Sequence, residues 1–267
     1  IYGSIICKFL GIKNINTVTG LGNIFINKNL FNNLIFYLYK AAIKNSYFNL
    51  FHNNHDLKIF TIKKKSDNKK FSVVNGSGVD LNLYKKINYP NESKKINILF
   101  IGRIIKEKGI FEYCYAAKIL KRNNKHINFY AAGEMEDERT KTKLKYFIDN
   151  KIVNFIGHIK SISDKIAECH LVVLPSYREG LSHSLLISCA IGRPIITTNV
   201  PGCKEIVTHD FNGYLCKTQS YENLAFFIDK FIKLPAKIKI NMANNSSTNI
   251  NKYDIKNIIS VYDKLII

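Results

Sequence analysis

From residue 96 onward, short apolar runs alternate with segments in which apolar residues recur every three or four positions. The runs predict buried strands at Ile96–Ile101, Ile127–Ala131, Val153–Ile156, Leu171–Leu174 and Ile195–Thr197. The periodic segments predict helices at Ile110–Arg122, Asp137–Asn150, Ile162–Cys169 and Tyr221–Leu234. Strands that alternate with helices favour an α/β fold with a doubly wound parallel sheet.

The segment that follows the fourth of these strands reads as a loop, a helix and a strand. The apolar run stops at Pro175, and the next regular pattern begins only after Gly180. Ser182 or Ser184 can cap a helix whose apolar residues cover most of its circumference, which predicts a buried helix. Gly192 suits the left-handed position that ends such a helix.

Charged residues follow two of the predicted strands. Ligands bind beyond the carboxyl ends of parallel strands, and a helix N-terminus there favours a phosphate. Glu179 is the acid nearest to that place, and Arg103 with Lys108 lies in the loop after the strand Ile96–Ile101. A guanidinium binds two phosphate oxygens at once, whereas an ammonium acts as a point charge. A basic pair in a loop is more often simply solvated, so this pattern leaves both interpretations open.

The first 85 residues contain fewer predicted elements. Strands are expected at Ile15–Val18 and Phe71–Val74, and a basic amphipathic helix at Leu30–Ile43. Such a helix can lie on an anionic membrane surface, although packing on a sheet is the commoner outcome. The glycines in Thr19–Gly22 form either a plain turn or a close backbone approach.

A polar segment with Pro90 inside it, residues 86–95, makes the best linker. It separates a partial N-terminal domain, residues 1–85, from a complete domain over residues 96–250 and a C-terminal helix within residues 251–267, at Ile255–Ile266. A domain built on a parallel sheet takes roughly 150 residues, more than the first one has. Because the chain also begins at Ile1 without Met, we expect a fragment that lacks its leading strands.

The chain carries a net charge of +20, from 40 Lys and Arg against 20 Asp and Glu. This favours an anionic partner, such as a phosphorylated substrate or an acidic membrane surface, but biased base composition explains it equally well. The basic segments Ile62–Lys65 and Ser93–Lys95 lack interleaved aromatic residues, and no nucleic-acid-binding motif is visible. We therefore expect no nucleic-acid partner.

The six cysteines are scattered without a CxxC pair, which favours reduced, mostly buried thiols in a cytosol. No apolar run approaches the roughly 20 residues that span a bilayer. His52 and His55 have no cysteine or acid at ligand spacing, so we expect surface residues and not metal ligands. These patterns predict a cytoplasmic protein, soluble or peripheral, that holds no metal or cofactor.

Several segments together resemble the retaining nucleotide-sugar glycosyltransferases of family 4. They are SGVD at Ser77–Asp80, FIGRIIKEKG at Phe100–Gly109, FIGH at Phe155–His158, VLPSYREGLSHSLLISCAIGRPIITTNVPG at Val173–Gly202 and NVPGCKEIV at Asn199–Val207. The resemblance covers nearly the whole chain and implies the GT-B arrangement, in which two Rossmann-like domains face each other across a cleft. The last helix is expected to return to the first domain. It implies transfer of a sugar, with retention of anomeric configuration, from a nucleotide sugar, expected to be a uridine-diphosphate sugar, to a lipid-linked or surface-polysaccharide acceptor.

The resemblance also implies roles for individual positions. The catalytic residues would be Arg103 and Lys108, which hold the diphosphate, and Glu179, which binds hydroxyls of the transferred sugar. Donor binding would further involve Gly102, Gly180, Ser184 and Leu185. The family's histidine near the reacting sugar matches Thr19 here, so no catalytic histidine is carried over. Of the histidines near the expected cleft, His183 can touch a phosphate and His158 is expected to be structural.

One position departs from the family pattern. The second signature glutamate should follow the first by eight residues, where this chain has Ile187. The missing carboxylate would accept hydrogen bonds from ribose hydroxyls, each worth roughly 1.5–3 kcal/mol, so losing two weakens donor binding about a hundredfold or more. An isoleucine on a buried helix leaves the fold intact. The alternatives are an enzyme with altered donor recognition, a noncatalytic nucleotide-sugar-binding or scaffold protein, and a decayed reading frame.

Overall fold

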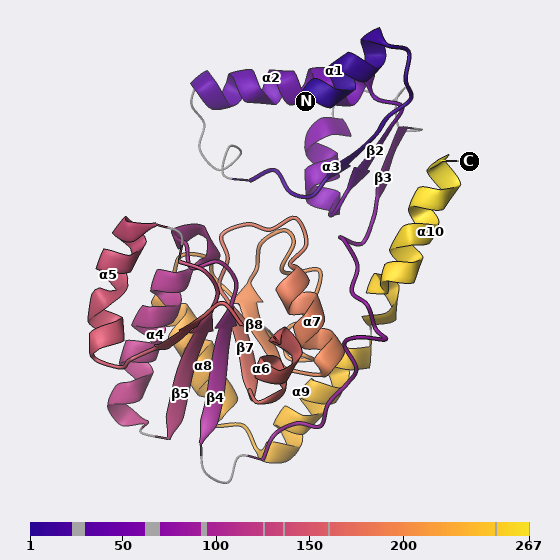
Figure 1. Cartoon of the computed structure of the whole chain (residues 1–267). Helices are drawn as coiled ribbons and strands as arrows, with labels where there is room; N and C mark the ends of the chain where they lie inside the picture. The colour runs from indigo at the N-terminus through magenta and orange to yellow at the C-terminus, as the bar shows by residue number, and fades with distance from the viewer. Residues whose placement is uncertain are drawn as a thin grey trace.

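The computed structural model describes residues 1–22, 30–61, 70–91, 95–124, 126–135, 137–159, 161–248 and 250–266, and it contains two parallel sheets (Figure 1). The small sheet has the order β1-β2-β3, formed by Ile15–Val18, Phe48–Phe51 and Phe71–Val73. The large sheet has the order β6-β5-β4-β7-β8-β9. Its strands in chain order are β4 Ile96–Ile101, β5 Ile127–Ala132, β6 Asn154–Gly157, β7 Leu171–Leu174, β8 Ile195–Thr198 and β9 Gly213–Cys216.

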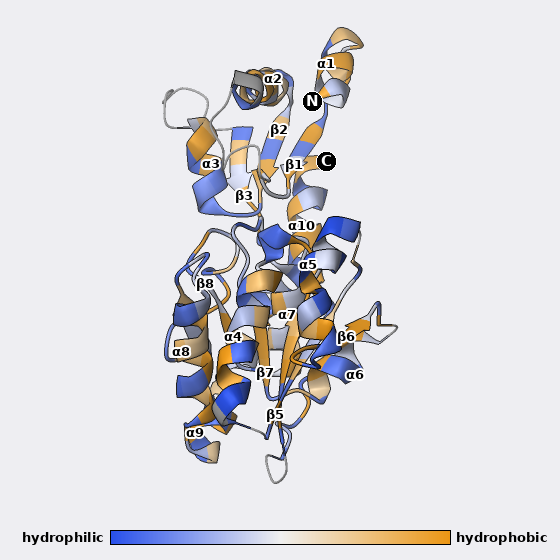
Figure 2. Cartoon of the chain, turned by 90° about the vertical axis from the view of Figure 1, so that its left-hand side faces the viewer, coloured by the Kyte–Doolittle hydropathy of each residue, from blue (hydrophilic) through white to orange (hydrophobic). Residues whose placement is uncertain are grey.

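Helices cover both faces of the large sheet, as its buried strands require. All four residues of β7 and of β8 are buried, because a parallel sheet enclosed by helices has no solvent face. In sequence order the helices of this unit are η3 Lys106–Lys108, α4 Ile110–Asn123, α5 Glu138–Asp149, α6 Ile162–Ala167, α7 His183–Ile191, α8 Tyr221–Ile232, α9 Ala236–Thr248 and η4 Ile250–Tyr253. Helix α4 packs on α8, and α7 packs on α6 and α9. Figure 2 shows the hydrophobic strands β5 and β7 between α8 on one side and α6 on the other.

The small sheet carries α1 Tyr2–Phe9, α2 Leu30–Asn45 and α3 Asn54–Thr61. The last helix, α10 Ile255–Ile266, leaves the large unit and packs on the small one, where the Tyr262 hydroxyl lies 2.8 Å from that of Thr17 in β1 (Figure 1). Its residues Ile258 and Leu265 belong to the same apolar cluster as Leu50 and Val74 of the small unit. The chain therefore crosses twice between the units, once before β4 and once before α10.

The strands Ile15–Val18, Ile96–Ile101 and Leu171–Leu174 and the helix Ile255–Ile266 have the predicted bounds. Among the described residues, seven elements lie where the sequence pattern predicted none: α1, β2, α3, η3, β9, α9 and η4. Helix α9 buries residues at helical spacing, but two of the four are polar, which hides the period: Lys239, Met242, Ala243 and Ser246. The buried Lys239 ammonium is satisfied by the Ile232 carbonyl, at 2.8 Å.

The predicted linker is tied to the large unit. The Arg193 guanidinium, fully buried, donates to the carbonyls of Ile87, at 2.9 Å, and Asn88, at 3.0 Å. Four further carbonyls accept from the same side chain, those of Ile166, Ala167, Ile191 and Gly192. One side chain therefore joins the linker to α6 and α7. Residues 62–65 and 93–94 of the predicted basic segments lie outside the described residues.

Helix α2 packs on the small sheet through Tyr39 and Ile43, which share an apolar cluster with Val18 and Phe51, but part of its apolar face is not covered. Ala42 and Ile43 are buried, but Leu34, Tyr37 and Leu38 are exposed. Helix α1 adds exposed apolar side chains, among them Tyr2 and Phe9. The small unit thus presents an apolar surface that nothing in the described residues covers.

The expectation of free, mostly buried thiols is met. All six cysteines are free, and every one except Cys7 is buried. Burial raises the pKa of Cys169, Cys189 and Cys216 to about 12, because a thiolate there would lose its hydration. These thiols are packing groups and poor nucleophiles.

Candidate functional site

The loop between β7 and α7 is held by the loops around it. Thr197 and Thr198 of β8 donate hydroxyl hydrogen bonds to the carbonyls of Leu174 and Ser176. The Glu179 amide donates to the Pro201 carbonyl at 3.1 Å. These bonds hold the backbone up to Glu179 and so fix the position from which its side chain extends.

The loop after β4 reaches the same place. Gly109 ends η3 with φ 76°, and a Cβ there would overlap the Pro175 carbonyl, so glycine allows direct packing of the two loops. The Tyr177 amide donates to the Glu107 carbonyl at 2.9 Å. This contact brings Lys108 next to the β7–α7 loop.

Lys108 and Glu179 form an ion pair at the carboxyl ends of β4 and β7. Lys108 Nζ lies 2.5 Å from Glu179 Oε1, and Ser176 Oγ donates to the same oxygen at 2.6 Å. The two charged side chains are 21% and 11% exposed, so the pair is open to a ligand yet shielded from bulk water. A cation, a carboxylate and a hydroxyl therefore meet within one hydrogen-bonding network.

Arg103 and Gly102, the other predicted diphosphate contacts in this loop, follow β4 directly. Arg103 is exposed and follows Gly102, whose amide donates to the Ala132 carbonyl at 3.0 Å. A Cβ at Gly133 would overlap the Gly102 carbonyl, so the ends of β4 and β5 lie in direct backbone contact. Arg103 is thus at the same edge of the sheet as Lys108, on the more exposed side.

Helix α7 begins at this edge. Ser182 is its N-cap, but the Ser182 hydroxyl lies 3.3 Å from that of Ser184 and makes no capping bond to the backbone. The first turn contains no acidic residue. Its amides, including that of the buried Leu185, are those that an α-helix leaves without an intrahelical partner, and the helix dipole makes this end attractive to an anion.

Two histidines were expected near the cleft, His183 and His158. His183 opens α7, and partial desolvation lowers its pKa below the ordinary value, opposed by a hydrogen bond with the backbone of Gly78. That bond links the helix to the predicted loop Ser77–Asp80 of the small unit. His158 Nδ1 lies 3.6 Å from Glu134 Oε1, in an exposed pair.

Ile187 lies inside the core. It is 2% exposed and belongs to the large apolar cluster that includes its neighbours Leu186 and Ile191. The position that the resemblance reserves for a carboxylate is therefore an apolar packing position in this chain.

The sequence patterns missed a polar cluster between the two units. Asp56 of α3 pairs with Arg178, the residue before Glu179, and Asn53 donates to the Gly180 carbonyl at 2.8 Å. His52, expected at the surface, is buried, and its pKa is lowered by desolvation, partly offset by Asp56. That expectation was wrong because the neighbouring unit covers the segment. The spacing of Asn53 and Asp56, a helix cap and its first turn, was the available signal.

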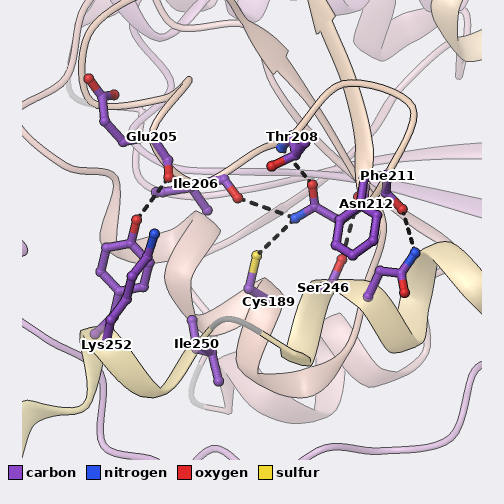
Figure 3. Close-up of a pocket in the computed structure, with 11 residues that line it drawn as sticks. Cys189, Glu205, Ile206, Thr208, Phe211, Asn212, Ser246, Ile250 and Lys252 are labelled. Atoms are coloured by element: carbon purple, nitrogen blue, oxygen red, sulfur yellow. Dashed lines mark hydrogen bonds between the residues drawn. The ribbon is translucent and has the colours of Figure 1, made fainter.

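A separate cavity of about 40 Å3 lies against the far end of α7 (Figure 3). Its polar groups already have partners: Asn212 Nδ2 donates to the Ile206 carbonyl at 3.2 Å and Ser246 Oγ to the Arg193 carbonyl at 2.8 Å. It holds a few water molecules at most, not a sugar nucleotide.

Within the described ranges, no three His, Cys, Asp or Glu side chains are grouped as metal ligands. None of the described helices is long and apolar enough to cross a bilayer. The prediction that the reaction needs no cofactor stays a prediction.

Comparisons with known proteins found related sequences. The family model "Glycosyl transferases group 1" matches residues 84–252. The N,N'-diacetylbacillosaminyl-diphospho-undecaprenol alpha-1,3-N-acetylgalactosaminyltransferase of Campylobacter jejuni is 26% identical over 269 residues, 93% of this chain and 70% of the relative. The capsular polysaccharide biosynthesis glycosyltransferase CapM of Staphylococcus aureus is 29% identical over 136 residues, 50% of this chain and 36% of the relative.

Solved structures show the same fold. Anabaena Alr3699/HepE in complex with UDP and glucose superimposes with a TM-score of 0.83 at 17% identity, over 99% of this chain and 74% of that one. The sucrose-phosphate synthase of Thermosynechococcus elongatus gives 0.80 at 17% identity, over 98% and 70%. The α/β architecture is therefore of the GT-B type, as the sequence predicted. The chain spans less than half of several curated relatives that it matches.

Proposed function

Because the chain belongs to the family of glycosyl transferases group 1, we propose that it transfers a sugar from a nucleotide-sugar donor with retention at the anomeric carbon. The donor is a uridine-diphosphate sugar, and the acceptor is lipid-linked or part of a surface polysaccharide. The acceptor class is supported by the names of the Campylobacter and Staphylococcus relatives, and the donor by the neighbour that binds UDP and glucose. The observation that carries the proposal is the Lys108–Glu179 pair beside the start of α7.

Each group at the site has a task in this reaction. Lys108 binds the diphosphate together with Arg103 and the first-turn amides of α7, at Ser184 and Leu185. Glu179 accepts hydrogen bonds from sugar hydroxyls. In the structure Lys108 and Glu179 neutralise each other, so donor binding exchanges one ion pair for contacts to phosphate and sugar.

The rate depends on charge that develops on the leaving nucleoside diphosphate. As the glycosidic C–O bond breaks, the sugar becomes oxocarbenium-like and the phosphate oxygen gains negative charge. Fixed cations and amide dipoles stabilise this charge without reorganisation, which is usually the largest contribution to the rate. Lys108 is partly shielded from water, so its interaction with that charge is stronger than in bulk solvent.

The same proposal places the protein at the cytoplasmic face of a membrane, bound peripherally. The net charge of +20 attracts an anionic surface, and α1 and α2 expose the apolar residues Tyr2, Phe9, Leu34 and Tyr37. A lipid-linked acceptor would be met at that surface.

A second candidate is a noncatalytic protein that binds nucleotide sugars or serves as a scaffold. The buried Ile187 favours it, because the carboxylate expected to hold the ribose is replaced by a core side chain. The two candidates differ in turnover and agree in donor binding.

The test compares two lysines of the same 3₁₀ turn. We expect calorimetry to show UDP binding, weakened about tenfold or more by Lys108→Ala, since a charge-assisted contact is worth roughly 1.5–3 kcal/mol. Lys106→Ala is the matched control, because Lys106 lies in the same turn as Lys108 but is exposed.

A chain that binds neither UDP nor other nucleoside diphosphates, or equal losses in the two variants, would refute the donor site. Binding without hydrolysis or transfer of a uridine-diphosphate sugar would favour the noncatalytic candidate. Arg103→Ala, measured alongside, reports whether the second cation contributes.

A further inference from the structure

The contact between the two units contains a buried ion pair. Asp56 lies in the first turn of α3 and its side chain is fully buried; Arg178, 13% exposed, precedes Glu179. One Asp56 oxygen accepts from Arg178 Nη2, which also lies 3.4 Å from His55 Nδ1. Arg178 Nε is buried and has no partner among the described residues, so Asp56 is the carboxylate on which this guanidinium depends.

A second bond holds the same loop. The Asn53 side-chain oxygen caps α3 by accepting from the Asp56 amide at 2.8 Å. Its amide group donates to the Gly180 carbonyl at 2.8 Å and to Asp56 Oδ2 at 3.2 Å. One asparagine thus orients the carboxylate and binds the loop across the interface.

Glycines bring the backbones together at this point. A Cβ at Gly180 would overlap the Thr19 carbonyl, and a Cβ at Gly20 would lie 3.0 Å from the Gly180 Cα. The Thr19–Gly22 segment is therefore a close backbone approach and not merely a turn.

Three successive residues of the loop therefore face different units. Arg178 and Gly180 are bound by the small unit, whereas Glu179 between them is bound by Lys108 and Ser176 of the large unit. Any separation of the units withdraws both anchors that flank Glu179. The buried Asp56 charge would be hydrated in an open form and is paired only in the closed one.

We propose that Asn53, Asp56 and Arg178 form an interdomain clasp that closes the cleft and sets the position of Glu179 for the donor. They are positioning residues, because they act on Glu179 through the loop that carries it. The effect on donor binding rests on the proposed function, whereas the clasp itself rests only on the contacts between the two units.

Two measurements test the clasp and its effect on donor binding separately. Hydrogen exchange of peptides covering residues 176–182 reports the clasp without any ligand, and calorimetry with UDP reports the donor site. The variants are Asp56→Asn, Arg178→Gln, their double variant and Asn53→Ser, which keeps a capping oxygen but loses the donor to Gly180. Asp210→Asn is the control, because Asp210 is an exposed acid paired with Lys230 at 3.0 Å.

We expect each clasp variant to speed exchange of the loop, and to weaken UDP binding, about tenfold, equivalent to 1.4 kcal/mol. The double variant should lose no more than the worse single one, because the two groups act as a unit. Arg178→Lys keeps the charge and should retain most of the affinity that Arg178→Gln loses. The control should match the unaltered chain in both measurements.

The outcomes are distinct. Unchanged exchange in Asp56→Asn and Asn53→Ser overturns the clasp, whatever UDP does. Faster exchange with unchanged UDP affinity overturns its link to the donor site. Faster exchange in a chain that never binds UDP supports the clasp and refutes the proposed function. If Asp56→Asn does not fold, Asn53→Ser decides alone.

Discussion

Replacing Ile187 by glutamate restores the family's carboxylate and at the same time puts an ionisable group into the core. Ile187 is 2% exposed and packed among apolar residues. A glutamate has a pKa near 4.3 in water, and a fully buried one has a pKa of about 8–9. The folded variant therefore keeps a proton that the unfolded chain releases.

The difference between the two pKa values sets how strongly the glutamate destabilises the fold at each pH. Below about pH 4 both states are protonated and no electrostatic penalty exists. Above it, folding becomes less favourable by about 1.4 kcal/mol per pH unit until the folded pKa is reached. With a folded pKa of about 8, the penalty is about 1 kcal/mol at pH 5 and about 4 kcal/mol at pH 7.

The assay is urea unfolding followed by circular dichroism at both pH values. Ile187→Gln is the control, because glutamine matches glutamate in size and is polar but cannot ionise. The free energy of unfolding of the two variants should differ by about 1 kcal/mol at pH 5 and about 4 kcal/mol at pH 7. An equal difference at the two pH values would refute the reasoning, since the carboxylate would then have reached water.

The same variant also tests the site. If the position still meets the ribose, UDP should bind the folded Ile187→Glu chain more tightly than Ile187→Gln, and binding at neutral pH should release a proton. Equal UDP affinities would mean that the helix no longer presents residue 187 to the donor.

Gly180→Ala should lower the melting temperature and speed exchange of the 176–182 loop, because its Cβ would overlap the Thr19 carbonyl; a chain unaffected in both would contradict the close approach. Arg193→Lys should lower the free energy of unfolding in urea by at least about 3 kcal/mol, since several buried carbonyls lose their donor while the charge is kept. Maleimide at pH 7 should label Cys7 alone in the folded protein and all six cysteines in denaturant, as mass spectrometry can count. Rapid labelling of a second folded-state cysteine would contradict the burial pattern.

Elements with a strong apolar signal were predictable to their ends. Strand β7 is a continuous apolar run, and β4 is a longer run interrupted only at Asn97, so hydrophobicity marks both of them. Strand β2, with Asn49 at its centre, carries no such signal, because Asn49 is buried in a network with Asn16 and Ser46 that only the fold assembles.

The meeting of Lys108 with Glu179 followed from topology. Both residues come after parallel strands that are neighbours in the sheet, and the carboxyl ends of parallel strands share one edge. The strand order and the short loops confine both side chains to a small region at this edge of the sheet. The sequence by itself therefore determined the fold type and placed both residues at the carboxyl ends of strands, and the order of the strands made them neighbours.

The pairing of Asp56 with Arg178 joins residues 122 positions apart in different units. No local pattern encodes it, because each residue alone reads as a solvated charge at a loop or a helix start. Only the tertiary structure decided it, by burying Asp56 completely and so leaving its charge to be balanced from the facing unit. The same contact between the units buries His52, which the sequence alone predicted at the surface.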